Sequence, residues 1–203
     1  MHFQAVGTRC AAHLPSLELP IGDREALEIL ERLGYRRVSV DIVALARAQV
    51  GVGVYRRGAR MREVPSTFDC SSFTKWLYGQ RGVRLPRKSI QQYEACSFLS
   101  SGRFLAGDLA FSTGAFSWYR HNPALGIGHV GLVTDEQTVI HAANPDLGVV
   151  EERLEVWQGW QGFRGVRRFI PSDVELVTLE CPPDAEIEWS DDIRWKILQR
   201  LPR

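Results

Sequence analysis

Cys70 is the residue in this sequence best placed to act as a nucleophile. It comes just before Phe73, Trp76 and Leu77, whose i, i+3, i+4 spacing predicts a helix lying on a core. A cysteine at the start of a helix meets free backbone N–H groups and the positive end of the helix dipole, and both favour the thiolate. We therefore expect a lowered pKa for Cys70 and a nucleophilic sulfur.

His129 and His141 could supply the base that such a nucleophile needs. They lie in two β-rich runs, residues 128–134 and 138–144, and the short polar break between the runs predicts a hairpin. A three-residue loop sets Gly131 opposite His141 and places both imidazoles on the same face of the sheet. One histidine can then take the thiol proton while the other holds that ring in its working tautomer.

The chemistry indicated by these three residues is acyl transfer to sulfur. We expect Cys70 to attack an amide carbonyl, while N–H groups at the helix start hold the oxyanion. His129 would take and return the proton, His141 would orient His129, and water would then hydrolyse the thioester. Asn144 is the alternative orienting residue if the register of the hairpin slips.

Helices and strands along the rest of the chain must position these residues. The alternating strands fit an antiparallel layer with helices on one side, which is an α+β arrangement. Residues 1–22 are expected to form an irregular arm, and Trp157 and Trp160 are expected in a turn. The remaining helices are expected over residues 23–33, 40–50, 89–96 and 193–201, and the remaining strands over 108–111, 148–155, 163–170 and 174–179.

Five short motifs follow one another in an order that resembles the NlpC/P60 family of cysteine peptidases. The similarity covers about residues 37–171. Two departures are Ser72, where the family more often has glycine, and the long segment between Phe111 and Gly128. The motifs are residues 69–72, 82–92, 107–111, 128–131 and 140–142.

The resemblance implies a papain-like α+β fold, with helices packed on a central antiparallel sheet and extensions at both ends. Residues 1–36 would form an arm with a short helix, residues 37–171 the catalytic domain, and residues 172–203 an acidic extension with a final helix. It also implies a substrate, a peptidoglycan stem peptide (muropeptide) cut at the γ-D-glutamyl to L-diamino-acid bond by a cysteine endopeptidase.

Substrate-binding residues are also suggested by the resemblance. Tyr55 would help to bind substrate or to shape the oxyanion site, while Asp69, Ser71 and Ser89 could hydrogen-bond the free amine end of a short peptide. A carboxylate such as that of Asp69 can pair with an ammonium group, although it could equally cap the helix. Trp118 lies in the long, aromatic-rich segment between Phe111 and Gly128, and it could line the cleft beside His129.

The composition is that of an ordinary globular protein. Of 203 residues, 44% are hydrophobic and 24% charged, and the net charge is +1, so nothing calls for nucleic acid or an anionic membrane as a partner. Two arginine-rich segments, residues 47–62 and 81–88, flank Cys70, and residues 173–192 carry eight acids. One interpretation is that both the basic and the acidic segments form solvated faces. The other is that the basic face binds an anionic peptide, or that the acidic tail docks onto it.

The cysteines and the start of the chain bear on cofactors and location. Cys10, Cys70, Cys96 and Cys181 show no C-x-x-C spacing, and we expect neither a metal nor a cofactor. A zinc site made of Cys70, His129 and His141 would lack a fourth ligand. No signal peptide or bilayer-length apolar run is visible, so we expect a cytoplasmic protein, with export by another route left open.

Two other classes of function remain open at this point. One is an amidase or acyltransferase that uses the same cysteine and histidines on a lipid or another amide. The other is a non-catalytic binding module that retains the fold. The sequence leaves the oligomeric state, the preferred diamino acid and any gating by the acidic tail or residues 113–128 undecided.

Overall fold

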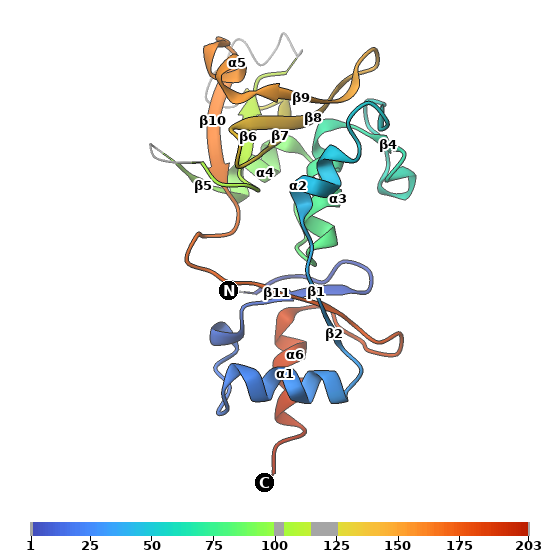
Figure 1. Cartoon of the computed structure of the whole chain (residues 1–203), viewed down its shortest axis with the longest axis vertical. Coiled ribbons are helices and arrows are strands. Elements are labelled where there is room, and N and C mark those ends of the chain that lie inside the picture. The colour runs from blue at the N-terminus through green and yellow to red at the C-terminus, as the bar shows by residue number, and fades with distance from the viewer. Residues whose placement is uncertain (1, 100–103, 115–125, 203) are drawn as a thin grey trace. The chain divides into compact units, whose positions relative to one another are not determined.

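The computed structural model describes residues 2–99, 104–114 and 126–202 and divides the chain into two compact units (Figure 1). The terminal unit consists of residues 1–40, 78–84 and 172–203. The central unit consists of residues 41–77 and 85–171, and it contains all the residues expected to do chemistry.

The central unit is built on a six-stranded antiparallel sheet in the order β5-β10-β6-β7-β8-β9. Its buried strand residues include Ala110, Val133, Val139 and Val166, so one hydrophobic cluster spans four neighbouring strands. The strands are β5 (Ser97–Phe98), β6 (Leu109–Ser112), β7 (His129–Val133), β8 (Thr138–Asn144), β9 (Gly148–Arg153) and β10 (Phe163–Arg168).

The hairpin of β7 and β8 has the predicted register. Leu132 pairs with Ile140 and Val133 with Val139, which is the pairing that a short loop after Val133 imposes. This register sets Gly131 opposite His141, so the prediction is confirmed.

Four helices accompany this sheet, and three of them were expected. They are α2 (Ile42–Arg47), α3 (Cys70–Gln80), α4 (Ser89–Ala95) and α5 (Leu154–Gly159). Helix α2 is shorter than the predicted range 40–50 and is capped by Asp41, whose carboxylate accepts from the N–H groups of the next turn. Mixed helices and an antiparallel sheet confirm the expected α+β class.

The unexpected helix is α5. We expected Trp157 in a turn, and that expectation is wrong, because Trp157 lies inside α5. The helix has only six residues and buries two of them, Leu154 and Trp157, which is too short a stretch for helical periodicity to show in the sequence.

A short pair of strands leads into the cysteine helix. Strand β3 (Val54–Tyr55) runs parallel to β4 (Thr67–Phe68), and Tyr55 pairs with Phe68. The connection between them contains the 3₁₀ turn η2 (Met61–Glu63). Since Phe68 is two residues before Cys70, this pairing fixes Tyr55 close to the start of α3.

The terminal unit has a three-stranded antiparallel sheet in the order β1-β11-β2, with α1 and α6 packed on each other (Figure 1). The expectation that residues 1–22 are irregular is wrong, since they contain a strand and a 3₁₀ turn. The elements are β1 (Arg9–Ala12), η1 (Leu14–Leu17), α1 (Asp23–Arg32), β2 (Arg36–Val38), β11 (Val177–Glu180) and α6 (Ser190–Leu198).

Candidate active site

Asp69 and Ser72 hold the start of α3 by a reciprocal pair of hydrogen bonds. The N–H of Ser72 donates to Asp69 Oδ1 at 2.7 Å, and the N–H of Asp69 donates to Ser72 Oγ at 2.9 Å. This is a capping box, in which each side chain satisfies the backbone of the other. Of the possible caps, Asp69 is therefore the one used, and Ser72 has a structural reason to stand where the family more often has glycine.

Cys70 is the first residue of α3 and lies against the backbone of β7. Its Sγ is 3.9 Å from the carbonyl oxygen of Gly128, and it accepts a hydrogen bond from the N–H of Val130. These two backbone groups belong to the residues on either side of His129. The sulfur and the histidine are therefore neighbours along β7.

The resting protonation state of Cys70 differs from the sequence-based expectation. Burial is the largest influence on its pKa, followed by the charge of Asp69, and together they raise the pKa to about 12. Hydrogen bonds from the N–H groups of Val130 and Ser71 lower it, but less. The expected lowering of the pKa is wrong, because the side chain is only 8% exposed and desolvation penalises the thiolate more than the helix end favours it.

His129 and His141 meet on one face of the β7–β8 hairpin, as predicted. His129 Nε2 lies 2.7 Å from His141 Nδ1, and the two rings are nearly perpendicular at 84°. Burial, and then the neighbouring His141, lower the pKa of His129 to about 3. At neutral pH the site therefore holds a neutral thiol and a neutral imidazole.

Gly131 makes room for this meeting. A Cβ atom at Gly131 would lie 2.3 Å from Val139 Cγ1 and 3.0 Å from His141 Cβ. Both distances fall inside ordinary van der Waals contact, so any other residue would displace the strand that carries His141 or its side chains.

Glu152 and Trp157 extend the pair of histidines, and neither was predicted as a site residue. Glu152 Oε2 lies 3.0 Å from His141 Nε2, and it also accepts from Trp157 Nε1 at 3.0 Å. The Trp157 ring stacks on His129 with centroids 5.5 Å apart. A signal for Glu152 exists in the sequence, because β8 and β9 form a second hairpin in which alternate residues of β9 share the face of His141.

Asp69 and Ser71 are held by Arg87, which the sequence indicated as a structural or solvent-facing residue and not as part of the site. The guanidinium donates to Asp69 Oδ1 at 3.0 Å, to Asp69 Oδ2 at 2.5 Å and to Ser71 Oγ at 3.0 Å. It also donates to the carbonyl oxygen of Ala59. The Asp69 carboxylate is thus shared between an arginine and the helix cap, so its predicted role towards a peptide amine remains a prediction.

The other predicted binding residues fall in three places. Tyr55 is half-buried, and burial and the charges of Cys70 and Asp69 raise the pKa of its phenol, so it lies near both. Ser89 is the buried first residue of α4. Trp118 lies outside the described residues.

A small pocket opens beside the histidines. It has a volume of about 200 Å³, and its walls join the polar groups of the site to apolar side chains on and after α5. Two of these apolar residues are exposed, Val156 at 58% and Trp160 at 47%. The lining residues are Ser112, His129, His141, Glu152, Val156, Trp157 and Trp160.

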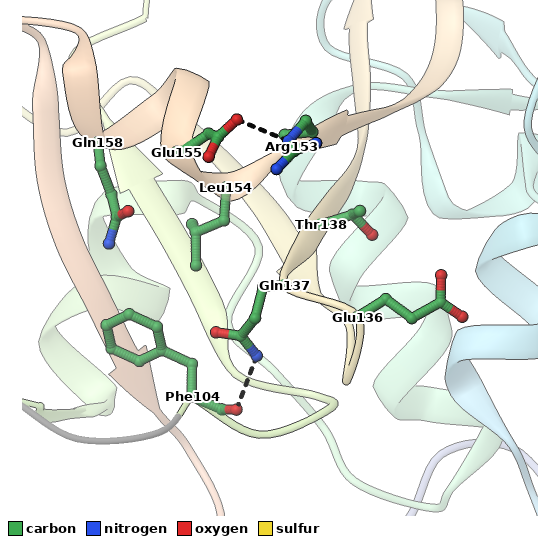
Figure 2. A pocket seen from close by; sticks show the side chains of 8 residues that line it. All are labelled: Phe104, Glu136, Gln137, Thr138, Arg153, Leu154, Glu155 and Gln158. Carbon is green, nitrogen blue, oxygen red and sulfur yellow. Dashed lines mark hydrogen bonds and ion pairs between the residues drawn. The ribbon is translucent and has the colours of Figure 1, made fainter.

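A larger pocket of about 400 Å³ lies near the β7–β8 turn and α5, and it carries no comparable chemistry (Figure 2). Arg153 on its wall pairs with Glu155 at 2.6 Å, and Gln137 donates to the carbonyl oxygen of Phe104 at 3.1 Å. Neither a cysteine nor a histidine lines it. Over residues 2–99, 104–114 and 126–202, no three cysteine, histidine or carboxylate groups gather in a way that could hold a metal ion.

Comparisons with known proteins point to one family. The model of the NlpC/P60 family matches residues 52–164, which is more than half of the chain. The chain is 35% identical over 99 residues to the "Probable endopeptidase p60" of Listeria innocua, a match that covers 49% of this chain and 19% of that protein. It is 27% identical over 105 residues to the "Gamma-D-glutamyl-L-lysine dipeptidyl-peptidase" of Bacillus cereus, covering 51% and 29%.

Solved structures agree at the level of the fold. The structure of NlpC1 from Trichomonas vaginalis superposes with a TM-score of 0.52 at 21% identity, covering 63% of this chain and 42% of that one. The chain spans less than a third of the two curated relatives named above.

Proposed function

The chain belongs to the NlpC/P60 family, and on that premise we propose that it is a cysteine endopeptidase that hydrolyses an amide bond in peptidoglycan stem peptides. One observation carries the proposal: Cys70 lies against the residues that flank His129, and His129 is hydrogen-bonded to His141. This arrangement supplies a nucleophile, a base and a group that orients the base.

The neutral resting pair sets the first step of the proposed reaction. With His129 Nε2 engaged by His141, His129 Nδ1 is the nitrogen left to take the thiol proton. Because the pKa of Cys70 is high and that of His129 is low, the proton leaves sulfur only as the bond from sulfur to the carbonyl carbon forms. Backbone N–H groups at the start of α3, including that of Cys70, would stabilise the resulting oxyanion.

The remaining steps return the proton and release the acyl group. The tetrahedral intermediate collapses, the C–N bond breaks, and the His129 imidazolium gives its proton to the departing amine. Water then attacks the thioester with His129 again as the base. The carboxylic acid leaves, and Cys70 regains its proton.

The proposed bond is the one between γ-D-glutamate and an L-diamino acid. Support comes from the family and from the name of the Bacillus cereus relative, which states activity on a γ-D-glutamyl-L-lysine bond. The surroundings of Cys70 also suit a short peptide, because Tyr55 and Ser71 lie near the sulfur.

Replacing Cys70 tests the proposal. A muropeptide of defined sequence, incubated with the protein and analysed by mass spectrometry, should yield two products cut at the γ-D-glutamyl bond. We expect Cys70→Ala to reduce the rate by at least about 10³-fold, because the nucleophile is removed, with an unchanged circular dichroism spectrum.

A matched control is Cys96→Ala. Cys96 is also a buried cysteine of the central unit, but it is the C-terminal cap of α4, and its carbonyl oxygen accepts a hydrogen bond from Arg167. This variant should keep the activity of the wild type. Substantial turnover by Cys70→Ala would refute the assignment of the nucleophile.

A second candidate is a binding module without catalysis, and the burial of Cys70 favours it. A thiol that is 8% exposed with a raised pKa can be an inert core residue. In that case the protein would bind the muropeptide, as measured by calorimetry, and return it uncut after prolonged incubation.

A further inference from the structure

We propose that Glu152 is a positioning residue that fixes where the protons of the two histidines lie, so that His129 presents a bare Nδ1 to Cys70. The inference rests on the proposed function and deepens it by adding a residue outside the Cys-His-His set.

The geometry is an unbroken chain of two hydrogen bonds. Glu152 Oε2 is 3.0 Å from His141 Nε2, and His141 Nδ1 is 2.7 Å from His129 Nε2. His141 therefore uses a different ring nitrogen at each of its two contacts. The chain ends at His129 Nε2, and the other nitrogen of His129, Nδ1, is the one left for the thiol.

The Glu152 carboxylate decides which atom donates and which accepts in each of these two hydrogen bonds. A glutamate that is ionised only accepts hydrogen bonds. Its hydrogen bond with His141 is the largest cause that lowers the pKa of Glu152, so the carboxylate is ionised at neutral pH. His141 must then carry its proton on Nε2.

The donor and acceptor roles fixed at His141 also determine those at His129. In its neutral form His141 has one N–H, so a proton on Nε2 leaves Nδ1 as an acceptor. His129 must therefore donate from Nε2, which leaves its Nδ1 without a proton. Reversing both bonds would put the proton of His129 on Nδ1, and that nitrogen could no longer act as the base.

Trp157 holds the carboxylate in place. Its indole N–H donates to the same oxygen of Glu152 at 3.0 Å, and its ring packs against both imidazoles. Two donors on one oxygen fix a side chain that is otherwise 41% exposed. The strands contribute as well, because Glu152 pairs with Val139 on β8 and so lies diagonally across from His141 on the same face.

The carboxylate also has an electrostatic effect once the reaction starts. Burial and His141 depress the basicity of His129, and the charge of Glu152 acts against them. When His129 takes up the thiol proton, Glu152 stabilises the imidazolium through His141. Because it acts through His141, its effect falls on the rate of the chemical step.

The first test reads the tautomers of the wild-type protein directly. Nitrogen-15 NMR correlations of the histidine rings should show both His129 and His141 protonated on Nε2 at pH 7. A proton on His129 Nδ1 would overturn the proposal. This measurement needs no turnover, so it separates failure of this inference from failure of the proposed function.

The second test is Glu152→Gln. A glutamine keeps the shape of the side chain but can donate as well as accept, so the direction of the chain is lost. We expect kcat to fall about 10- to 100-fold, as outer partners of functional histidines typically cost, with KM changed less than about twofold. The NMR spectrum should show a mixture of tautomers at His129.

Glu151→Gln is the matched control. Glu151 is the neighbouring residue on β9, faces the other side of the sheet, and pairs with Arg47 at 3.1 Å. The Glu151→Gln substitution should leave kcat and the histidine tautomers unchanged. If Glu152→Gln does not fold, Trp157→Phe removes the indole donor together with part of the ring that packs on the imidazoles, and the less restrained carboxylate should give a smaller loss of kcat and a smaller admixture of the second tautomer. Unaltered tautomers and kcat in these variants would refute the positioning role.

Discussion

At the scale of single residues, the site is defined by two groups held in their neutral forms. Burial raises the pKa of Cys70 to about 12 and lowers that of His129 to about 3. A position at a helix start alone predicts the opposite for the thiol. The difference arises because the sulfur packs against the backbone of β7, and a sequence does not reveal that packing.

The neutral His129 makes a prediction about stability in acid. Its pKa is about 3 in the folded protein and about 6.5 in the unfolded chain, so the unfolded state binds a proton first as the pH falls. As the pH falls from about 6.5 to about 3, His129 should lower the unfolding free energy by up to about 1.4 kcal/mol for each pH unit. Above pH 6.5 it has no such effect.

Urea unfolding of the wild type and His129→Gln from pH 7 to pH 4.5 measures this cost. The unfolding free energy of the wild type should fall more steeply than that of the variant, because glutamine does not titrate. Carboxylates other than Glu152, whose pKa depends in part on His129, contribute equally to both proteins and cancel in the comparison. Parallel curves would show that His129 is not held neutral by burial.

The contact between Arg87 and Asp69 changes how the predicted amine site is viewed. The Asp69 carboxylate already accepts from a guanidinium and from the N–H of Ser72. A peptide ammonium would have to share that carboxylate with Arg87. Ser71 is held by the same guanidinium, so the three side chains act as one polar cluster beside Cys70.

At the scale of elements, the hairpin of β7 and β8 is the part that the sequence predicted best. The length of a hairpin loop fixes its register, and the register decides which residues face each other. The same reasoning applied to β8 and β9 would have found Glu152. That step requires the length of a second turn, where β8 also has an irregularity between Ala142 and Asn144.

Gly131 offers a test of the β7–β8 hairpin. A methyl group at this position would lie impossibly close to Val139 and tightly against the Cβ of His141, so the strand or the side chains must shift. We expect Gly131→Ala to lower the unfolding free energy by about 1–3 kcal/mol, as overpacking of a core does. It should also lower kcat, because His141 moves relative to His129.

Gly159→Ala is the control for that substitution. Gly159 ends α5 in the same unit, and a Cβ there would meet nothing within 4 Å. The unfolding free energy of the Gly159→Ala protein should stay within about 0.5 kcal/mol of the wild-type value. Equal behaviour of the two alanine variants in denaturation and in turnover would show that the close approach at Gly131 is not required.

The elements that were missed are short or depend on distant partners. Strand β1 has four residues, and its partner β11 lies more than 160 positions later in the chain. Helix α5 buries only two side chains. Neither has a local pattern strong enough to separate it from irregular structure, whereas the apolar stripe of α3 extends over several turns.

At the scale of the whole molecule, the chain forms two units, and the terminal unit contains both ends of the sequence. Strand β11, from the acidic C-terminal segment, is the middle strand between β1 and β2. The C-terminal segment is therefore joined to the N-terminal residues through one sheet, by way of Val177–Glu180. The proposed division into an arm, a catalytic domain and an extension, and the expected cytoplasmic location, stay predictions.

The family could be identified from the sequence, because five motifs in order are specific, whereas the chemistry of the site stays a proposal. The matched family region, residues 52–164, lies within the predicted catalytic domain. No helix in the described ranges combines the length and the apolar character that crossing a bilayer demands. What the sequence analysis did not supply were the protonation states, which depend on burial, and Glu152 as a partner of His141, which depends on the length of a second turn.

The central claim is that Cys70 forms a thioester with the acyl part of a muropeptide, and rapid acid quenching followed by intact-protein and peptide mass spectrometry tests it most directly. The account predicts an added mass equal to the acyl fragment, located on Cys70, removed by hydroxylamine and absent from Cys70→Ala. Product formation with no such adduct, or an adduct on Cys10, Cys96 or Cys181, would contradict it.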